Sequence, residues 1–451
     1  MSQPMKRRIS ISIVFLVLTG HALGQAAPTA ALPGFDGAGV TPAGQAGPAL
    51  PWVDGTLHYA LSASEIVSKG YYRGDVTTSE GISGNVGYSS MSQTHPTSLL
   101  FAGGVFFGRG GQSGATTFQN VAVSQGLIKG LWAFSVTDSF SFLPLSPVTG
   151  VAGVPGVSTP GDLPTPGPAD GPAGGILTYS GNRISNALTG SVQRRLTGRT
   201  SFSGSGSWML LHFLDEHAGM DNSMKTGQLA LNHIIDARNT VSLAATYAIN
   251  DTSNILQVLP DSYPATLSYQ TKGLSLSYSR QWTRSLSTSL SAGPMWVQSS
   301  AAPLIPNRLN YSLNASLGYR RPMTGYNLRF AHGISGGSGV QPGVISDTLS
   351  GSVSRTFARE WSGSASLSYI RTSGLLQTPS EGFSTNGITN GEYGTVQVTH
   401  GFTRTISGYA SYTAQHQSVH QIFATNAFNG LSHTFGFGIS WTPRSTRLGD
   451  F

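Results

Sequence analysis

The feature of this sequence that most constrains its fold is an alternation of apolar and small polar residues with a period of two. From Leu309 to Tyr319 every second residue is apolar or aromatic, and the residues between them are Asn, Ser or Gly. The segments 361–369 and 431–441 show much the same alternation. Because successive side chains of a β-strand point to opposite faces of the sheet, each segment has one apolar face and one small polar face. The pattern predicts an all-β protein.

The connections between these segments are alternately short and long. Short basic turns with aromatic neighbours lie at 194–199, 236–239, 280–284, 320–322, 355–359 and 402–404. Longer polar connections lie at 215–224, 251–264, 300–307, 333–343, 373–390 and 417–429. Short turns at one end and long loops at the other are typical of transmembrane β-barrels. In hydrocarbon every backbone N–H and C=O must be paired, so such a sheet closes on itself. We therefore predict a closed antiparallel transmembrane β-barrel.

The alternation also gives a strand count. Strands are expected near 56–68, 82–90, 97–108, 115–126, 129–142 and 184–195, and twelve more follow the turn at residue 197. The total is about eighteen, with sixteen the next choice, because bacterial barrels of this kind have an even number of strands. Propeller blades and a secreted β-sandwich are the alternatives. Blades hold four short strands, whereas each unit here holds two long ones, and sandwich strands are shorter with charged outer faces.

Composition excludes several classes of protein. Charged residues make up 10% of the 451 residues, well below the share in typical soluble domains. The chain has no Cys, which excludes disulfide scaffolds, thiolate metal sites, Cys nucleophiles and lipid attachment at Cys. The net charge is +7, but the basic residues are scattered, so we expect no nucleic-acid partner.

The N-terminus has the three parts of an export signal. Lys6, Arg7 and Arg8 precede an apolar run that is too short to span a bilayer, and small residues follow at 22–24. We expect a cleaved signal peptide at 1–24 and a flexible Ala/Gly/Pro-rich periplasmic lead-in at 25–54. The barrel is expected at 55–441 and a C-terminal tail at 442–451.

The strand rhythm, the export signal and the ending 434–441 resemble bacterial outer-membrane β-barrel proteins of porin type. The resemblance covers about 56–441 and implies a location in the outer membrane, surrounded by its lipid. It also implies that the barrel-assembly machinery reads the last strand, through Gly436, Phe437, Ile439 and Trp441. Members of this family often stop at the terminal aromatic, whereas here Thr442 to Phe451 follow, so Trp441 and Phe451 both stay candidates for the signal. A homo-oligomer is compatible with the resemblance, since porins are frequently trimers.

The inner face is where function is expected. A barrel of sixteen to eighteen strands leaves an aqueous channel, and the polar faces carry short Ser, Thr, Gly and Asn side chains. We expect a channel for the diffusion of small hydrophilic solutes, without cofactor, metal site or catalytic residue. A Pro/Gly-rich segment at 143–175 follows the fifth strand and resembles, in position and length, the loop that constricts porin channels. Its Asp162 and Asp170 would favour cations if it folded inward, and Lys272 and Arg329 on the inner face would oppose them. A parity change near Gly273 predicts a β-bulge there.

Aromatic residues are expected to mark the two membrane interfaces. The candidates near the upper, long-loop end are Tyr247, Trp296 and Tyr369. Those near the lower, short-turn end are Trp282, Tyr319, Phe357, Trp361, Phe402 and Trp441.

Two other functions stay open. The protein could be a structural or surface-binding barrel whose long loops engage an external partner. It could also be an outer-membrane hydrolase, because His212, Asp215, Glu216, His217 and Asp221 form the densest polar cluster. Catalysis needs a base or nucleophile oriented by a further group, and sequence proximity alone does not supply this.

Overall fold

The computed structural model describes residues 55–70, 76–90, 92, 94–109, 114–144, 182–214, 220–253, 266–300, 304–335, 343–376, 387–420, 428–444 and 446–448. The expected signal peptide (1–24) and lead-in (25–54) lie outside these residues and stay predictions. The described residues contain no helix long and apolar enough to cross a membrane.

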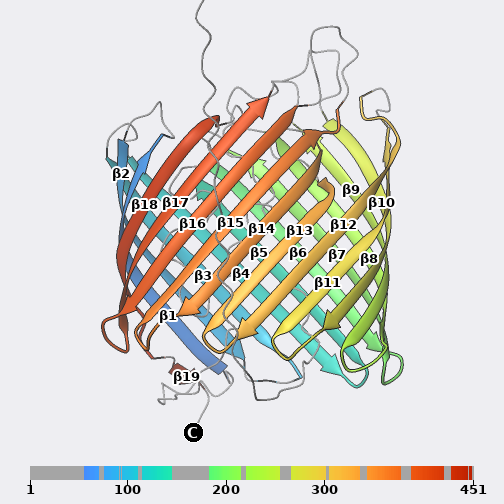
Figure 1. Ribbon diagram of the computed structural model, residues 1–451, viewed down its shortest axis with the longest axis horizontal. Coiled ribbons are helices and arrows are strands. Elements are labelled where there is room, and N and C mark those ends of the chain that lie inside the picture. The colour runs from blue at the N-terminus through green and yellow to red at the C-terminus, as the bar shows by residue number, and fades with distance from the viewer. Residues whose placement is uncertain are drawn as a thin grey trace, which may run out of the picture. The chain divides into compact units, whose positions relative to one another are not determined.

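The described chain forms one closed antiparallel barrel of eighteen long strands (Figure 1). Each strand pairs with the next, and β1 closes the ring by pairing with β18 as well as with β2. The predicted fold and the predicted count of eighteen are confirmed. The strands are β1 Gly55–Lys69, β2 Val76–Ser90, β3 Thr97–Arg109, β4 Gly114–Lys129, β5 Trp132–Pro144, β6 Asn182–Arg195, β7 Thr200–Phe213, β8 Asp221–Ile234, β9 Asn239–Ser253, β10 Thr266–Gln281, β11 Leu286–Ser299, β12 Arg308–Arg321, β13 Thr324–Ser335, β14 Val344–Thr356, β15 Trp361–Gly374, β16 Ile388–Gly401, β17 Ile406–His420, β18 Gly430–Trp441 and the short β19 Thr446–Leu448.

The two ends of the barrel differ as the sequence predicts. All six short basic turns join an even-numbered strand to the next odd-numbered one, so they lie at a single end, here called the turn end. The longer connections join odd-numbered strands to even-numbered ones at the opposite, loop end. The strand set begins at Gly55 and its last long strand stops at Trp441, and both residues are at the turn end. There β19 extends the sheet by pairing with Gly55–Leu57 of β1.

Two strand boundaries differ clearly from the prediction: β2 begins at Val76 instead of near residue 82, and the hairpin between β4 and β5 lies later in the chain. The hairpin between β4 and β5 turns at Gly130 and Leu131, whereas the alternation placed the turn two to three residues earlier. Gly130 has a φ of 60°, which glycine adopts at little cost and which a tight two-residue hairpin requires. A glycine within an otherwise apolar stretch was therefore the true turn signal.

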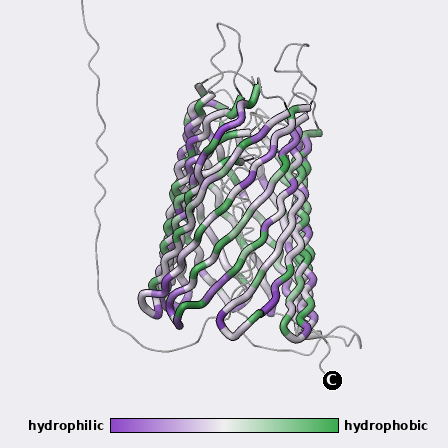
Figure 2. The backbone as a smooth tube through the Cα atoms, turned by 90° about the vertical axis from the view of Figure 1, so that its right-hand side faces the viewer, coloured by the Kyte–Doolittle hydropathy of each residue, from purple (hydrophilic) through white to green (hydrophobic). Residues whose placement is uncertain are grey.

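Contacts across the interior show which side chains face the lumen. Tyr269 of β10 lies against Gly343, just before β14, and packs in one apolar cluster with Leu375, just after β15. These strands are four and five places further round the sheet, so the side chains meet only by pointing inward. Directly opposed residues of neighbouring strands share a face, so the registers extend this assignment around the whole barrel. Figure 2 shows the resulting alternation of apolar and polar residues along the strands.

The predicted β-bulge at Gly273 is wrong. The register of β10 against β9 is unbroken from Thr266 to Arg280, and the register against β11 is the same on both sides of residues 274–275. Leu267 and Tyr269 therefore face the lumen, whereas Leu274, Leu276 and Tyr278 face outward. Inward apolar residues, rather than an inserted residue, explain the change of pattern.

An apolar cluster lines the lumen at the loop end. It joins residues of β10 and β11 with residues of the connections before β8 and β12 and after β15, all of them buried. Its buried members are Met220, Leu267, Tyr269, Val297, Leu304, Ile305, Leu375 and Leu376. Parts of the long connections thus fold into the mouth of the barrel instead of projecting away from it.

Candidate functional site

Most side chains of the lumen wall are short and polar, apart from buried apolar residues such as Phe106, Phe118 and Tyr269, and the outer face carries large apolar ones. Leu367 of β15 is 70% exposed on the outer face, and its neighbours Ser366 and Ser368 face inward. On β18 the exposed Phe435, Phe437, Ile439 and Trp441 alternate with inward small residues. A ring of this many strands is too wide for such side chains to fill by themselves.

The carboxylates of the described strands lie on the outer face alone, whereas basic side chains lie on both faces. The described strands place five arginines and one histidine on the inner face: Arg183, Arg195, Arg308, Arg320, Arg329 and His58. The carboxylates of the described strands all face outward: Glu65, Glu80, Asp138, Asp221, Asp251, Asp347 and Glu392. The inner wall of the described strands therefore carries basic residues without carboxylates, while other basic residues, such as Lys272 and Arg280, face outward.

Arg329 lies within a recess in the wall of β9–β13. The recess has a volume of about 410 Å³ and is lined by hydroxyl groups of four strands, including Ser242, Ser277 and Ser291. Arg329 stands directly opposite Ser316 of β12 and Ser350 of β14. Ser316 in turn forms a hydrogen bond of 2.7 Å with the hydroxyl of Ser289 on β11. The inward position expected for Arg329 is the one the structure shows.

Lys272 does not line the lumen, which corrects the expectation from parity. It lies directly opposite Tyr247 and Trp296, and all three face outward with Leu274 and Leu276. Its ammonium group donates a hydrogen bond of 2.9 Å to the side chain of Gln298. Because Leu267 and Tyr269 point inward without a bulge, the neighbouring even-numbered positions, Lys272 among them, point outward.

Arg308 is one of the inward basic residues that the sequence did not single out as a lumen charge. It is the first residue of β12, faces the lumen at the loop end, and lies opposite the buried Val297 of the apolar cluster. Its Nε and Nη2 atoms are buried and have no hydrogen-bond partner, and neither has Nδ2 of the inward Asn310. Only its occurrence just after a long connection could have suggested such a role.

The loop-end constriction expected at 143–175 cannot be placed. Its first two residues end β5, the fifth strand as predicted, and the rest, with Asp162 and Asp170, lies outside the described residues. The described segments that do enter the mouth are around Leu304, Ile305, Leu375 and Leu376. An apolar pair within a polar connection is the signal that could have found them.

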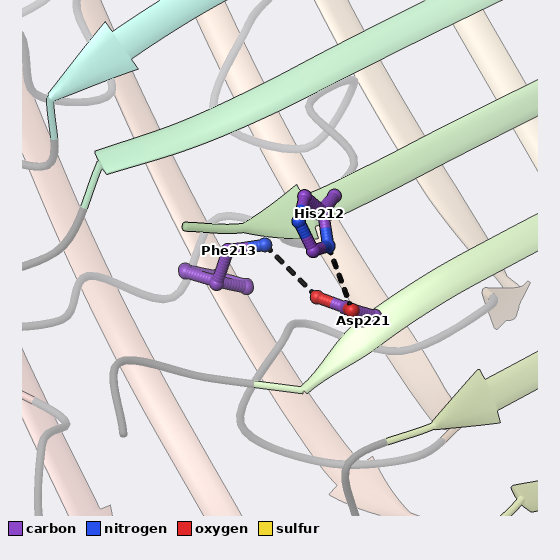
Figure 3. Close-up of polar contacts among 3 residues, drawn as sticks. All are labelled: His212, Phe213 and Asp221. Carbon is purple, nitrogen blue, oxygen red and sulfur yellow. Dashed lines mark hydrogen bonds and ion pairs between the residues drawn. The ribbon is translucent and has the colours of Figure 1, made fainter. Parts of the chain in front are cut away.

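The polar cluster of the sequence is described only in part. His212 Nδ1 lies 2.8 Å from Asp221 Oδ2, and the backbone N–H of Phe213 donates to Asp221 Oδ1 at 2.9 Å (Figure 3). Both carboxylate oxygens are therefore used to tie the loop-end tips of β7 and β8 together. Asp215, Glu216 and His217 lie outside the described residues. Among the described residues, no group of three or more His, Asp or Glu side chains could hold a metal ion.

The candidate lower aromatic residues lie at the turn end, and three of them pair with arginines. The guanidinium of Arg280 lies 4.1 Å from the ring centre of Trp282, that of Arg321 lies 5.6 Å from Tyr319, and that of Arg355 lies 6.0 Å from Phe357. The ring of Trp361 stacks on His400, which also contacts Phe402. Tyr247, Trp296 and Tyr369 are exposed on the outer face, nearer the loop end. The role of these rings as interface girdles stays a prediction.

The predicted assembly residues divide between the two faces of β18. Phe437, Ile439 and Trp441 face outward and are exposed, whereas Gly436 faces the lumen. Phe437 lies opposite Glu65 of β1, at the seam that closes the barrel. Their recognition by an assembly machinery stays a prediction.

No protein-family model matches the sequence, and no curated protein matches it. Among solved structures, Pseudomonas aeruginosa OpdL is 9% identical, with a TM-score of 0.41 over 86% of this chain and 99% of that one. OccK2 (OpdF) from the same organism, in complex with glucuronate, is 9% identical, with a TM-score of 0.42 over 86% and 98%. The P. aeruginosa siderophore receptor PirA is 7% identical, with a TM-score of 0.40 over 86% and 80%. The function must therefore be argued from the residues of this barrel itself.

Proposed function

We propose that the protein is an outer-membrane barrel that forms a water-filled channel for the diffusion of small hydrophilic solutes. The observation that carries this proposal is the division of the strands into two faces. Most Leu, Phe and Trp side chains of the strands project outward, and Ser, Thr, Asn and Gly make up most of the residues that project into the ring of eighteen strands. An apolar outer face suits lipid, and an eighteen-strand ring with short polar inner side chains suits a continuous column of water.

The narrowest part of this channel is expected at the loop end. The apolar cluster around Tyr269 and Ile305 covers the β10–β15 side of the mouth, and the inner wall below it is lined by serine and threonine. A solute that enters at the loop end passes the apolar cluster first and then the hydroxyl-rich wall below it. This arrangement supports diffusion of small molecules.

Conductance and flux measurements test this function. The full chain, refolded into lipid vesicles and fused with a planar bilayer, is expected to give stable ion-conducting steps. Vesicles containing it are expected to swell in isotonic solutions of small sugars and not of large dextrans. The control is the protein added in unfolded form. A folded, heat-resistant barrel without conductance and without sugar flux would overturn the proposal and favour a structural or surface-binding barrel.

A further inference from the structure

We propose that the lumen selects for small anions, which pass along a column of arginines on β12 and β13. The column consists of Arg308, Arg329 and Arg320. The proposal rests on the channel function above, and it specifies the class of solute that the channel favours.

The three arginines follow one side of the lumen from mouth to mouth. Arg308 begins β12 at the loop end, Arg320 is the last but one residue of β12 at the turn end, and Arg329 of β13 stands opposite Ser316 between them. At a rise of about 3.4 Å per residue, Arg308 is roughly 27 Å along the strand from the level of Arg329, and Arg320 is roughly 14 Å beyond it. The column therefore covers most of the length of the wall.

Arg308 is the arginine of the column whose side chain most favours a bound anion. Its Nε and Nη2 atoms are buried without an acceptor, and the buried Nδ2 of Asn310 projects inward from the next inward position of the same strand, also without one. A buried donor without a partner is costly, and more so on a charged group. A guanidinium offers parallel N–H groups that match a carboxylate or phosphate, so an anion that enters the mouth satisfies donors that the protein leaves unpaired.

The recess around Arg329 extends this path. Its hydroxyl groups come from strands β9 to β12, among them Thr240, Ser279 and Ser289, and they can donate hydrogen bonds to an anion held near the guanidinium. Hydroxyl groups replace part of the water shell of the solute without adding a competing charge. Passage is thereby favoured without tight binding, as conduction requires.

The described lumen wall offers no opposing charge. Its basic groups are five arginines and His58, and the carboxylates of the same strands point outward. A wall of one sign in a narrow passage concentrates ions of the opposite sign. Selection for anions follows from the signs of these side chains together with their facing.

The test is the reversal potential of the reconstituted full chain across a gradient of potassium chloride. The wild type is expected to show a chloride-to-potassium permeability ratio above one. The variants Arg308→Gln, Arg329→Gln and Arg320→Gln are each expected to lower that ratio, and the triple variant to lower it most. Lys272→Gln is the matched control, since it removes one positive charge from the outer face of the same barrel.

A second measurement separates the mouth from the rest of the column. Inorganic phosphate is expected to reduce the chloride current of the wild type more than that of Arg308→Gln, and Arg308→Lys is expected to keep the chloride preference while losing part of the phosphate effect. A conducting barrel that prefers potassium, or whose preference survives the triple variant, overturns the selection of anions alone. A folded barrel that never conducts overturns the proposed channel and this inference with it.

Discussion

Gly293 of β11 lies against the backbone carbonyl of Leu274 on β10, so closely that a β-carbon at position 293 would overlap that oxygen. At this place the ladder between the two strands is interrupted: Gly273 pairs with Met295 and Leu276 with Ala292, and no pairing joins the residues between them. Pro294, which has no N–H to donate, is one of the unpaired residues. The ladder is thus interrupted at a glycine and a proline, and the register is the same on both sides of the interruption.

Gly293→Ala is therefore expected to destabilise the barrel. A backbone oxygen cannot rotate away as a side chain does, so the two strands must separate, at a cost of about 1–3 kcal/mol in the free energy of unfolding. Urea-induced unfolding in lipid vesicles measures this change. Gly190→Ala is the control, because no atom lies within 4 Å of a β-carbon at position 190. Equal stability of the two variants would contradict the close contact.

Leu367 and Ser366 test the assignment of the two faces with neighbouring residues. Leu367 faces outward near the middle of β15, so Leu367→Arg places a charge in lipid and is expected to lower the free energy of unfolding by about 2–4 kcal/mol. Ser366→Arg places the same charge in the lumen, where it is expected to cost little stability and to raise the preference for chloride. Unfolding and reversal-potential measurements distinguish the two. If Ser366→Arg were the more damaging variant, the faces would be reversed.

The strand order and the two ends of the barrel could be predicted because their signals are local. Alternation is visible within one strand, and turns such as 320–322 are marked by basic residues and proline. The inner apolar cluster could not be predicted in this way. Leu267 and Tyr269 look lipid-facing in sequence, and only the packing of Leu304, Ile305 and Leu375 from distant connections explains their burial.

The candidate site was predicted less well for the same reason. The sequence suggested both Lys272 and Arg329 as lumen charges, and register places them on opposite faces. One wrong assumption, the bulge at Gly273, reversed the facing of Lys272. Arg308 carries no motif, because its unpaired donors arise from how the start of β12 is buried. Side-chain facing, rather than composition, decides the charge of the lumen.

The contact between Arg280 and Trp282 is expected to stabilise the turn end. The guanidinium lies 4.1 Å from the ring centre, and the indole N–H is fixed by a 2.8 Å hydrogen bond to Thr288. A double-mutant cycle with Arg280→Gln and Trp282→Leu is expected to give a coupling of about 0.5–1 kcal/mol, typical of an exposed cation–π pair. Lys129→Gln with Trp282→Leu serves as the uncoupled control. Strict additivity of the Arg280 and Trp282 variants would contradict a direct interaction.

Asp236 gives the turn between β8 and β9 a dependence on pH. Hydrogen bonds from the Asn239 side chain and from the backbone N–H of Arg238 lower the pKa of Asp236 below its ordinary value of 3.8. A lowered pKa means that the turn is stabilised above the ordinary value and loses this contribution as pH falls through the lowered one. The protection of the Arg238 and Asn239 amides, relative to the intrinsic exchange rate at each pH, is expected to fall only below pH 3.8, and Asp236→Ala is expected to abolish that dependence. A pKa at or above the ordinary value would contradict the turn geometry.

Variants at the seam between β18 and β1 distinguish folding of the barrel from its recognition in the cell. Trp441 and Phe437 face outward beside β1, and the ring of Trp441 contacts that of Tyr59 at 6.0 Å. If these exposed rings are the assembly signal, Phe437→Ala with Trp441→Ala should reduce insertion into the outer membrane strongly. The same variant should still refold in detergent, because neither ring is buried in the lumen.

Truncation after Trp441 decides between the two terminal aromatics. It removes the tail with Phe451 and the short pairing of β19 with Gly55–Leu57, and it leaves the nine-residue pairing of β1 with β18 intact. We therefore expect the truncated chain to insert in cells and to show the heat-modifiable mobility of a closed barrel. Phe435→Ala is the matched control for the Phe437 and Trp441 variant, because Phe435 carries another exposed ring on the same face. Failure of the truncated chain and of Phe451→Ala, with insertion retained by the Phe437 and Trp441 variant, would move the signal to the tail.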